Sequence, residues 1–194
     1  MIFSKLYHNS ISGASLVKQT SVWYSMEKCK GVDRMELRKG TMDDLIAVAH
    51  VEAVCFSAAE AASPESFRQR LEVFSDCFWL LWEGDTLVSM VNGMASDEHD
   101  LRDEMFHDAN LHRPDGDWLM IFGVATVPEY QRQGCAAQVL NRAIEDSRTL
   151  GRKGVVLTCK DFRVPYYAKF GFVDEGISSS EHGGAVWHQM RITF

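Results

Sequence analysis

The feature that most constrains the fold is an apolar run, Trp118–Thr126, which is closed by Pro128 and followed within a few residues by a helical pattern. A run of this length without polar alternation predicts a strand buried on both faces. Over residues 134–150, small and apolar residues recur at helical spacing, which predicts a helix that packs on the sheet. A buried strand that leads through a short loop into such a helix is typical of an α/β domain.

The rest of the chain alternates between strand-like and helix-like patterns and contains no repeat. We predict strands at 35–38, 77–82, 86–94, 155–158, 172–175 and 185–192, and helices at 43–56, 64–74 and 164–170. Residues 96–117 are polar and are predicted to form one helix and a loop. The sequence therefore predicts a mixed α/β (α+β) fold.

Composition limits the classes of function. A chain of 194 residues with 46% hydrophobic and 24% charged residues suits one globular domain. A net charge of -7 without a dense Lys or Arg run argues against nucleic acid as a partner. We find no apolar segment long enough for a membrane helix and no signal peptide. The five cysteines form no C-x-x-C pair, so we expect reduced thiols and no metal site. Reduced thiols and the lack of an apolar membrane segment together lead us to expect a cytoplasmic protein without a membrane partner.

Residues 1–34 differ from everything that follows. They are rich in Ser, Asn and Lys and show no sustained helical or strand period. Met26 and Met35 are alternative starting points, and residues 35–38 have the pattern of a first strand. We expect residues 1–34 to be an N-terminal extension, poorly ordered or not native, and residues 35–194 to form the domain.

The loop after the buried strand has the residues of an anion site. The segment 131–136, Gln-Arg-Gln-Gly-Cys-Ala, places small residues where the helix begins. Small residues let backbone amides approach a ligand, and amides at a helix N-terminus bind phosphate groups without a basic cluster. Taken alone, the same pattern also fits an ordinary helix start after a loop.

In its context the segment resembles the acetyl-CoA signature of the GCN5-related N-acetyltransferase (GNAT) superfamily, Q/R-x-x-G-x-G/A after a strand. Residues 124–126 before it, Pro128–Tyr130 at the turn and residues 167–172 after it match the family's pattern. Residues 111–116 and 159–167 are similar to the arylalkylamine N-acetyltransferase branch. The resemblance covers residues 35–194 and implies a single domain whose mixed, mostly antiparallel central sheet is flanked by helices.

The resemblance also implies where acetyl-CoA binds as the acetyl-donor cosubstrate. The strand end would pair with the pantetheine arm and the loop would hold the pyrophosphate, which assigns Val124, Ala125, Thr126, Gln131, Arg132, Gln133, Gly134, Cys135, Ala136, Ala137 and Tyr167 to the coenzyme. Tyr167 falls on the family's tyrosine near the sulfur, where a phenol can protonate the leaving thiolate. Both Tyr166 and Tyr167 also fit an aromatic core, and we expect Tyr166 to serve packing.

The sequence offers several candidates for the base that deprotonates the amine. The branch carries two histidines on the strand before the motif, and Met120 and Phe122 stand there instead. Glu52, Asp161 or water held by backbone carbonyls are the alternatives, or the enzyme uses the neutral fraction of its amine. We expect the two loop histidines, His107 and His112, to be solvated surface residues.

The same branch implies an apolar acceptor pocket. Its lining is expected to comprise Phe56, Ser57, Met120, Phe122 and Thr158, although core packing explains the same residues. Neither Cys135 nor Cys159 has a histidine at a recognisable spacing, which favours direct attack in a ternary complex over an acyl-cysteine.

The expected function is therefore N-acetylation of a primary amine, a small aryl- or alkylamine, by a monomer or homodimer. Acetylation of a protein or peptide amine, favoured by a wide groove, and a non-catalytic acetyl-CoA sensor are the alternatives.

Overall fold

The strands form one mixed sheet in the order β1-β2-β3-β4-β5-β7-β6 in the computed structural model, which describes residues 35–194. Their bounds are β1 Met35–Lys39, β2 Phe78–Glu83, β3 Thr86–Ser96, β4 Trp118–Thr126, β5 Gly154–Cys159, β6 Val173–Ile177 and β7 His188–Thr193. Only β4 and β5 are parallel; every other neighbouring pair is antiparallel. This arrangement confirms the predicted fold class. The expectation for residues 1–34 lies outside the described residues.

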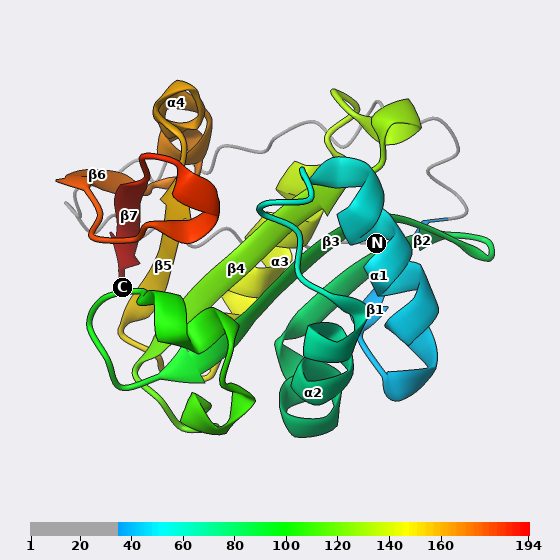
Figure 1. Cartoon of the computed structure of the whole chain (residues 1–194), viewed down its shortest axis with the longest axis horizontal. Coiled ribbons are helices and arrows are strands. Elements are labelled where there is room, and N and C mark those ends of the chain that lie inside the picture. Colours follow the sequence, from blue (N-terminus) through cyan, green and yellow to red (C-terminus); the bar gives the residue numbers. More distant parts are fainter. Residues whose placement is uncertain (1–34) are drawn as a thin grey trace, which may run out of the picture.

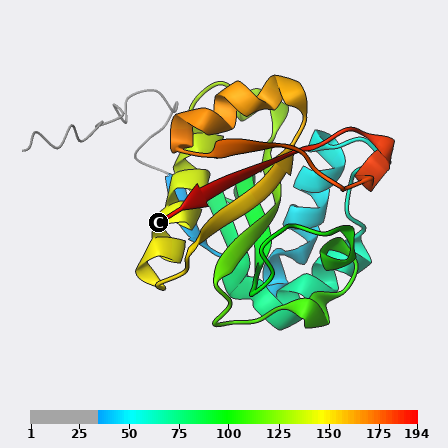
Figure 2. The same cartoon turned by 90° about the vertical axis from the view of Figure 1, so that its left-hand side faces the viewer.

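Helices cover both faces of the sheet. Helices α1 (Leu45–Cys55) and α2 (Pro64–Phe74) lie on one face, and α3 (Cys135–Thr149) lies on the other (Figures 1 and 2). Helix α4 (Val164–Tyr167) is short and follows the carboxyl end of β5 (Figure 1). None of the helices in residues 35–194 is long and apolar enough to cross a membrane.

The helix bounds follow from local chemistry. Helix α2 begins where Ser63 accepts a hydrogen bond from the Ser66 amide and Pro64 occupies the first turn. Ahead of α1, the predicted helix at 43–56 opens with a 3₁₀ turn, Met42–Asp44, in which Thr41 and Asp44 form a capping box.

Helix α3 has the predicted apolar face. It buries Val139, Leu140, Ala143 and Ile144 against the sheet, at the spacing of one helix face. The core that these side chains join runs through β2, β3, β4 and β5.

Residues 96–117 depart from the prediction of one helix and a loop. They contain two 3₁₀ turns, Asp103–Phe106 and Ala109–Leu111, and no α-helix. Side chains replace a helical hydrogen-bond ladder here, since Asp108 accepts from the Asn110 amide and Asp103 accepts from the Ser180 hydroxyl. The segment is thus held by distant contacts rather than by its own periodicity.

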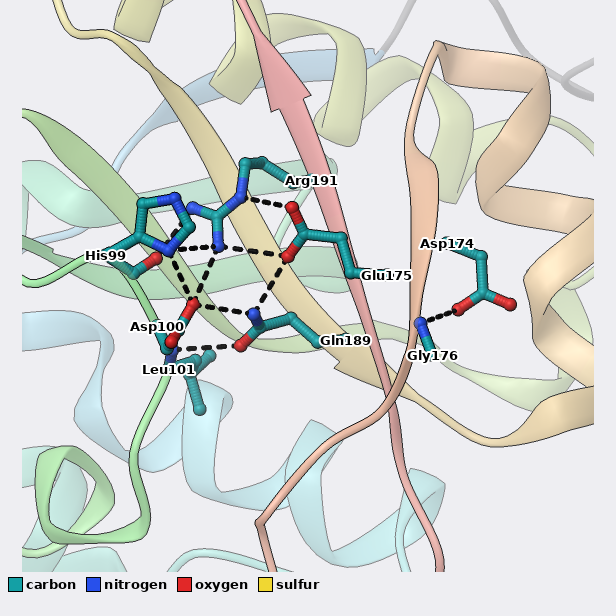
Figure 3. Close-up of polar contacts among 8 residues, drawn as sticks. All are labelled: His99, Asp100, Leu101, Asp174, Glu175, Gly176, Gln189 and Arg191. Atoms are coloured by element: carbon teal, nitrogen blue, oxygen red, sulfur yellow. Dashed lines mark hydrogen bonds and ion pairs between the residues drawn. The ribbon is translucent and has the colours of Figure 1, made fainter.

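An ionic cluster around Arg191 joins this segment to the sheet (Figure 3). The Arg191 side chain, only 5% exposed as a residue, donates to both carboxylate oxygens of Glu175 on β6, at 2.7 and 3.0 Å. It also donates to Asp100 at 2.8 Å and to the His99 carbonyl at 2.6 Å, and its guanidinium lies 4.6 Å from the Trp118 ring centre. One side chain therefore links β7, β6 and the loop that follows β3.

We predict that Arg191→Met lowers the free energy of unfolding by about 2–3 kcal/mol, somewhat less than the loss of a fully buried pair because the carboxylates reach solvent. Hydrogen bonds from Arg191 hold the pKa of Glu175 below its ordinary value of 4.5. A carboxyl group whose pKa is lower in the folded state stabilises the fold fully above its unfolded-state pKa. This contribution is lost as the pH falls through the folded-state pKa. The difference between wild type and variant in urea unfolding should therefore be full at pH 7 and shrink below about pH 4.5.

Arg68→Met is the matched control, because Arg68 also pairs with two carboxylates, Glu65 and Glu72, but lies exposed on α2. Exposed pairs contribute roughly 0–1 kcal/mol, so this variant should unfold almost as wild type does. Equal effects of the two substitutions would contradict the role given to the cluster.

Candidate active site

The two parallel strands part before they end. The ladder between β4 and β5 runs from Trp118↔Gly154 to Ile121↔Leu157, and beyond it β4 pairs with β3 alone. Figure 1 shows the two strands diverging toward their carboxyl ends. The last part of β4 therefore borders a gap in the sheet.

The peptide groups of this strand end point alternately to β3 and to the gap. The Val127 amide donates to Val88 at 3.0 Å and the Ala125 carbonyl accepts from Ser89 at 2.8 Å, so both residues face β3. Alternation then turns the peptide groups of Val124 and Thr126 toward the gap. The Thr126 carbonyl already accepts from the Cys55 thiol and from the Gln131 side chain. Among the predicted strand-end residues, Val124 is thus best placed to pair with a ligand.

The loop before α3 bends through two left-handed residues. Arg132 has φ 60° and Gly134 has φ 89°. Gln138 donates to the Gly134 carbonyl, and the amides of Ala136 and Ala137 precede that residue, so they have no acceptor within the helix. A Cβ at Gly134 would meet nothing within 4 Å, so space lies open beside the backbone. This geometry suits a phosphate group at the helix N-terminus.

Other predicted coenzyme residues have structural contacts in the same loop. The Gln133 side chain donates to the Glu129 carbonyl at 2.7 Å, and Cys135 is buried as the first residue of α3. Their side chains thus hold the loop, while exposed backbone remains at Arg132 and Gly134.

Tyr167 is the last residue of α4, which follows β5 on the other side of the gap. Its half-buried ring lies 5.2 Å from the Tyr166 ring and 5.9 Å from the Phe172 ring, both edge-on. Burial raises the pKa of Tyr167, so the phenol keeps its proton at neutral pH. A protonated hydroxyl can donate a proton to a departing thiolate.

A cavity of about 240 Å³ lies under α1 and α2 on the opposite face from α3. Two helices, two strands and three connecting segments contribute to its wall, which comprises Glu52, Glu60, Ala61, Ala62, Ser63, Arg70, Asn92, Phe106, His107, Phe122 and His182. Three of these side chains are aromatic rings in contact, because Phe106 lies 4.9 Å from Phe122 and 4.8 Å from His182.

Glu52 is a buried carboxyl group in this wall. Only 6% of the residue is exposed, and its Oε1 accepts from the Ala62 amide at 3.0 Å. Its Oε2 is buried and has no hydrogen-bond partner in residues 35–194. A Cβ placed on Gly123 would lie 3.9 Å from that oxygen, so the carboxyl group packs over the face of β4 that α1 covers. Burial raises the pKa of Glu52, which makes its carboxylate a stronger base than that of an exposed glutamate.

Arg70 is a buried cation in the same wall. The residue is 5% exposed, and its guanidinium donates to Asn92 Oδ1 at 3.3 Å and to the Phe106 carbonyl at 2.8 Å. Its Cζ lies 4.8 Å from the Phe122 ring centre and 5.3 Å from that of Phe67. Burial lowers the pKa of Arg70 to about 10, which leaves the side chain charged at neutral pH.

The rim of the cavity joins segments that are far apart in the sequence. Lys160, just beyond β5, forms an ion pair with Glu60 at 2.6 Å. His182 Nε2 lies 3.0 Å from the Glu60 carbonyl, and Trp187 donates to the His182 carbonyl at 2.8 Å. The loop after α1 and the segment before β7 therefore meet at the rim of the cavity.

The structure separates the residues that were predicted to line the acceptor pocket. Phe122 lines the cavity, but Met120 is fully buried in the core and lies outside its wall. Phe56 lies beside Gly123, Ser57 is exposed, and Thr158 is half-buried on β5. A register shift pairs Asn92 with Gly123 and Gly93 with Ile121, which leaves Phe122 as an extra residue. This bulge breaks the strict alternation that would put Met120 and Phe122 on one surface.

The two histidines of the polar segment differ. His107 is exposed at the cavity wall. The expectation that His112 is solvated is wrong, because it is 7% exposed, accepts from the Ala95 amide at 3.2 Å and packs 4.9 Å from the Phe74 ring. Of the two carboxylates considered as bases, Glu52 lies in the cavity, whereas the Asp161 side chain is 91% exposed.

Sequence reasoning missed Arg70, although a signal was present. Arg70 falls on the buried face of α2 with Phe67, Leu71 and Phe74, just as Glu52 falls on the buried face of α1 with Val48 and Val51. A charged residue at apolar spacing indicates a buried polar site or a functional one. Asn92, Phe106 and His182 line the same cavity only because segments far apart in the sequence meet there.

Comparisons with known proteins agree with this geometry. Residues 45–172 match the model of the Acetyltransferase (GNAT) family. The serotonin N-acetyltransferase of Mesocricetus auratus is 27% identical over 158 residues, which cover 79% of this chain and 74% of that protein.

Solved structures share the fold. The loading GNATL domain of CurA from Lyngbya majuscula has a TM-score of 0.71 at 15% identity, covering 82% of this chain and 97% of that one. The GphF GNAT-like decarboxylase in complex with isobutyryl-CoA has a TM-score of 0.67 at 18% identity, covering 81% and 98%. Because the family model spans most of the described domain, and its signature loop lies beside the parted strands, the chain belongs to the GNAT acetyltransferase family.

Proposed function

We propose that the protein transfers the acetyl group of acetyl-CoA to the primary amine of a small molecule, by direct attack in a ternary complex. Family membership supports the acetyl transfer. The observation that carries the acceptor assignment is the cavity of about 240 Å³, in which the buried Glu52 carboxyl group lies over β4 next to Gly123. A recess of this size with an ionisable group fits a small amine.

The residues around the gap fit the coenzyme. Val124 would pair with the pantetheine arm as a strand partner does, and the amides at the start of α3 would hold the pyrophosphate. The open space beside Gly134 leaves room for the phosphates. The bound thioester supplies the activated acetyl group, and the protein orients it in the gap.

Proton transfer is divided between Glu52 on α1 and Tyr167 at the end of α4. Glu52 receives a proton from the acceptor ammonium, which has no lone pair until it loses one. Tyr167 donates its proton to the sulfur that leaves the acetyl group. Met120 and Phe122 have no ionisable group, so Glu52 on α1 would serve as the base instead.

The alternatives have less support. A peptide acceptor would be favoured by a wide groove, whereas contacts from Lys160 and His182 to Glu60 narrow one side of the cavity's rim. A non-catalytic sensor would have no need of a buried carboxyl group without a hydrogen-bond partner for one of its oxygens.

We predict thiol release from acetyl-CoA with small amines and much slower release with a Lys peptide. The measurement follows free thiol with phenethylamine, tryptamine, spermidine and the peptide at equal concentration. Preference for the peptide would contradict the small-molecule assignment, and silence on a broad panel of amines would contradict catalysis.

We predict that Tyr167→Phe lowers kcat at least a hundredfold, in line with the roughly 10²–10⁴-fold contribution of a general acid, while the Kd for coenzyme A stays within about threefold. Tyr166→Phe is the matched control, because the neighbouring ring packs on Tyr167 and Phe170. Unchanged turnover in Tyr167→Phe, or an equal loss in both variants, would remove the acid role.

We predict that Gly134→Glu weakens coenzyme A binding roughly a hundredfold, because a carboxylate would stand where the helix N-terminus attracts the pyrophosphate. Gly176→Glu is the control for backbone strain, since Gly176 has φ 93° against 89° for Gly134 and both face open space. Binding is measured by calorimetry. Equal affinities of the two variants would refute the phosphate site.

A further inference from the structure

The acceptor cavity contains one cation and one anion that are not neutralised by hydrogen-bonded ionic partners. Both hydrogen bonds from Arg70 go to neutral acceptors, the Asn92 amide oxygen and the Phe106 carbonyl. Glu52 accepts one bond from a backbone amide, and its Oε2 has no partner in the described part of the chain. By contrast, Glu60 at the rim is paired with Lys160.

Such buried charges are only partly compensated, because Arg70 and Glu52 attract each other across the cavity wall without a hydrogen bond between them in the described part of the chain. A buried ion loses hydration, and the loss is offset only by close opposite charge or by hydrogen bonds. The two rings beside Arg70, Phe67 and Phe122, hold the planar guanidinium in place. The fork of donors is therefore already ordered before a ligand arrives, which favours the binding of a planar anion such as a carboxylate.

Asn92 lies between the two charged groups. Its Oδ1 accepts from Arg70, while its Nδ2 lies 3.0 Å from the Cβ position of Gly123, the same point that lies 3.9 Å from Glu52 Oε2. The carboxyl group and the guanidinium thus face the cavity from either side of one amide. A ligand that carries an ammonium and a carboxylate on adjacent positions matches this order of charges.

We propose that the acceptor is a free α-amino acid with an aromatic side chain, whose carboxylate binds Arg70 and whose amino group is directed to Glu52. The side chain lies against the rings of Phe106, Phe122 and His182, which form one aromatic wall. This inference rests on the proposed N-acetyltransferase function and names the substrate class.

The reaction balances without another reactant. The amino nitrogen bonds to the acetyl carbon as the carbon–sulfur bond breaks. Of the three protons of the ammonium, one remains on the new amide and two leave. Glu52 takes up the first proton, and Tyr167 protonates the sulfur. In the overall balance, one of the two protons ends on the coenzyme thiol and the other passes to solvent.

The test compares phenylalanine with phenethylamine, which differ by the carboxylate alone. In wild-type enzyme, thiol release should show a kcat/KM at least tenfold higher for phenylalanine. Arg70→Gln should raise the KM for phenylalanine about a hundredfold and lower kcat/KM for phenethylamine at least tenfold less than kcat/KM for phenylalanine, because phenethylamine has no group for the guanidinium. Arg70→Lys, which keeps the charge and loses the fork, should restore part of the affinity.

Arg68→Gln is the matched control on the exposed face of the same helix and should leave both substrates unchanged. Thermal unfolding of each variant separates loss of the site from loss of the fold. If Arg70→Gln does not fold, the wild-type preference and calorimetry of phenylalanine binding with coenzyme A present decide the question.

Wild-type preference for phenethylamine, or equal losses on both substrates in a folded Arg70→Gln variant, would overturn the inference and leave the proposed function standing. Turnover of neither substrate, nor of any other amine or amino acid in a panel, would overturn both. Faster turnover of phenylalanine that depends on Arg70 would support both.

Discussion

The parting of β4 and β5 after Ile121 and Leu157 is the constraint on which the rest of the site depends. A sheet normally satisfies the peptide groups of an inner strand on both edges, so a strand end with one open edge requires another partner. The gap also places two helix termini opposite each other, the start of α3 after β4 and the end of α4 after β5. One departure from regular pairing thus creates the edge, the anion site and the position of Tyr167.

The acceptor side is built on the opposite face and depends on buried polar groups. Glu52 and Arg70 occupy core-facing positions of α1 and α2, where apolar side chains would give greater stability. Groups that are retained at such a cost are typical of functional sites. The cluster around Arg191 contributes at a distance, because it anchors the loop that leads to Phe106 and His107 in the cavity wall.

Local signals were sufficient wherever the chain builds an element from its own residues. The bounds of α2 and β4 agree with the pattern because capping, proline and the apolar run all lie within the element. The segment 96–117 was predicted less well, since its two 3₁₀ turns depend on side chains such as Ser180 from far along the chain. Met120 and Phe122 were grouped because they stand at the two histidine positions of the branch that the chain resembles, whereas the bulge at Phe122 depends on the register with β3.

By itself, the sequence determined the class of fold, the order of its elements and the loop before α3, because periodicity and small residues are local properties of the chain. Glu52 and Arg70 stand at the spacing of the apolar residues around them, a local signal that the prediction did not use. Only the tertiary structure decided that these two charges share one cavity with Asn92, and that His112 is buried while Glu52 Oε2 is left without a partner. Burial and the separation of charges are set by segments far apart in sequence, and no local pattern records which of them meet.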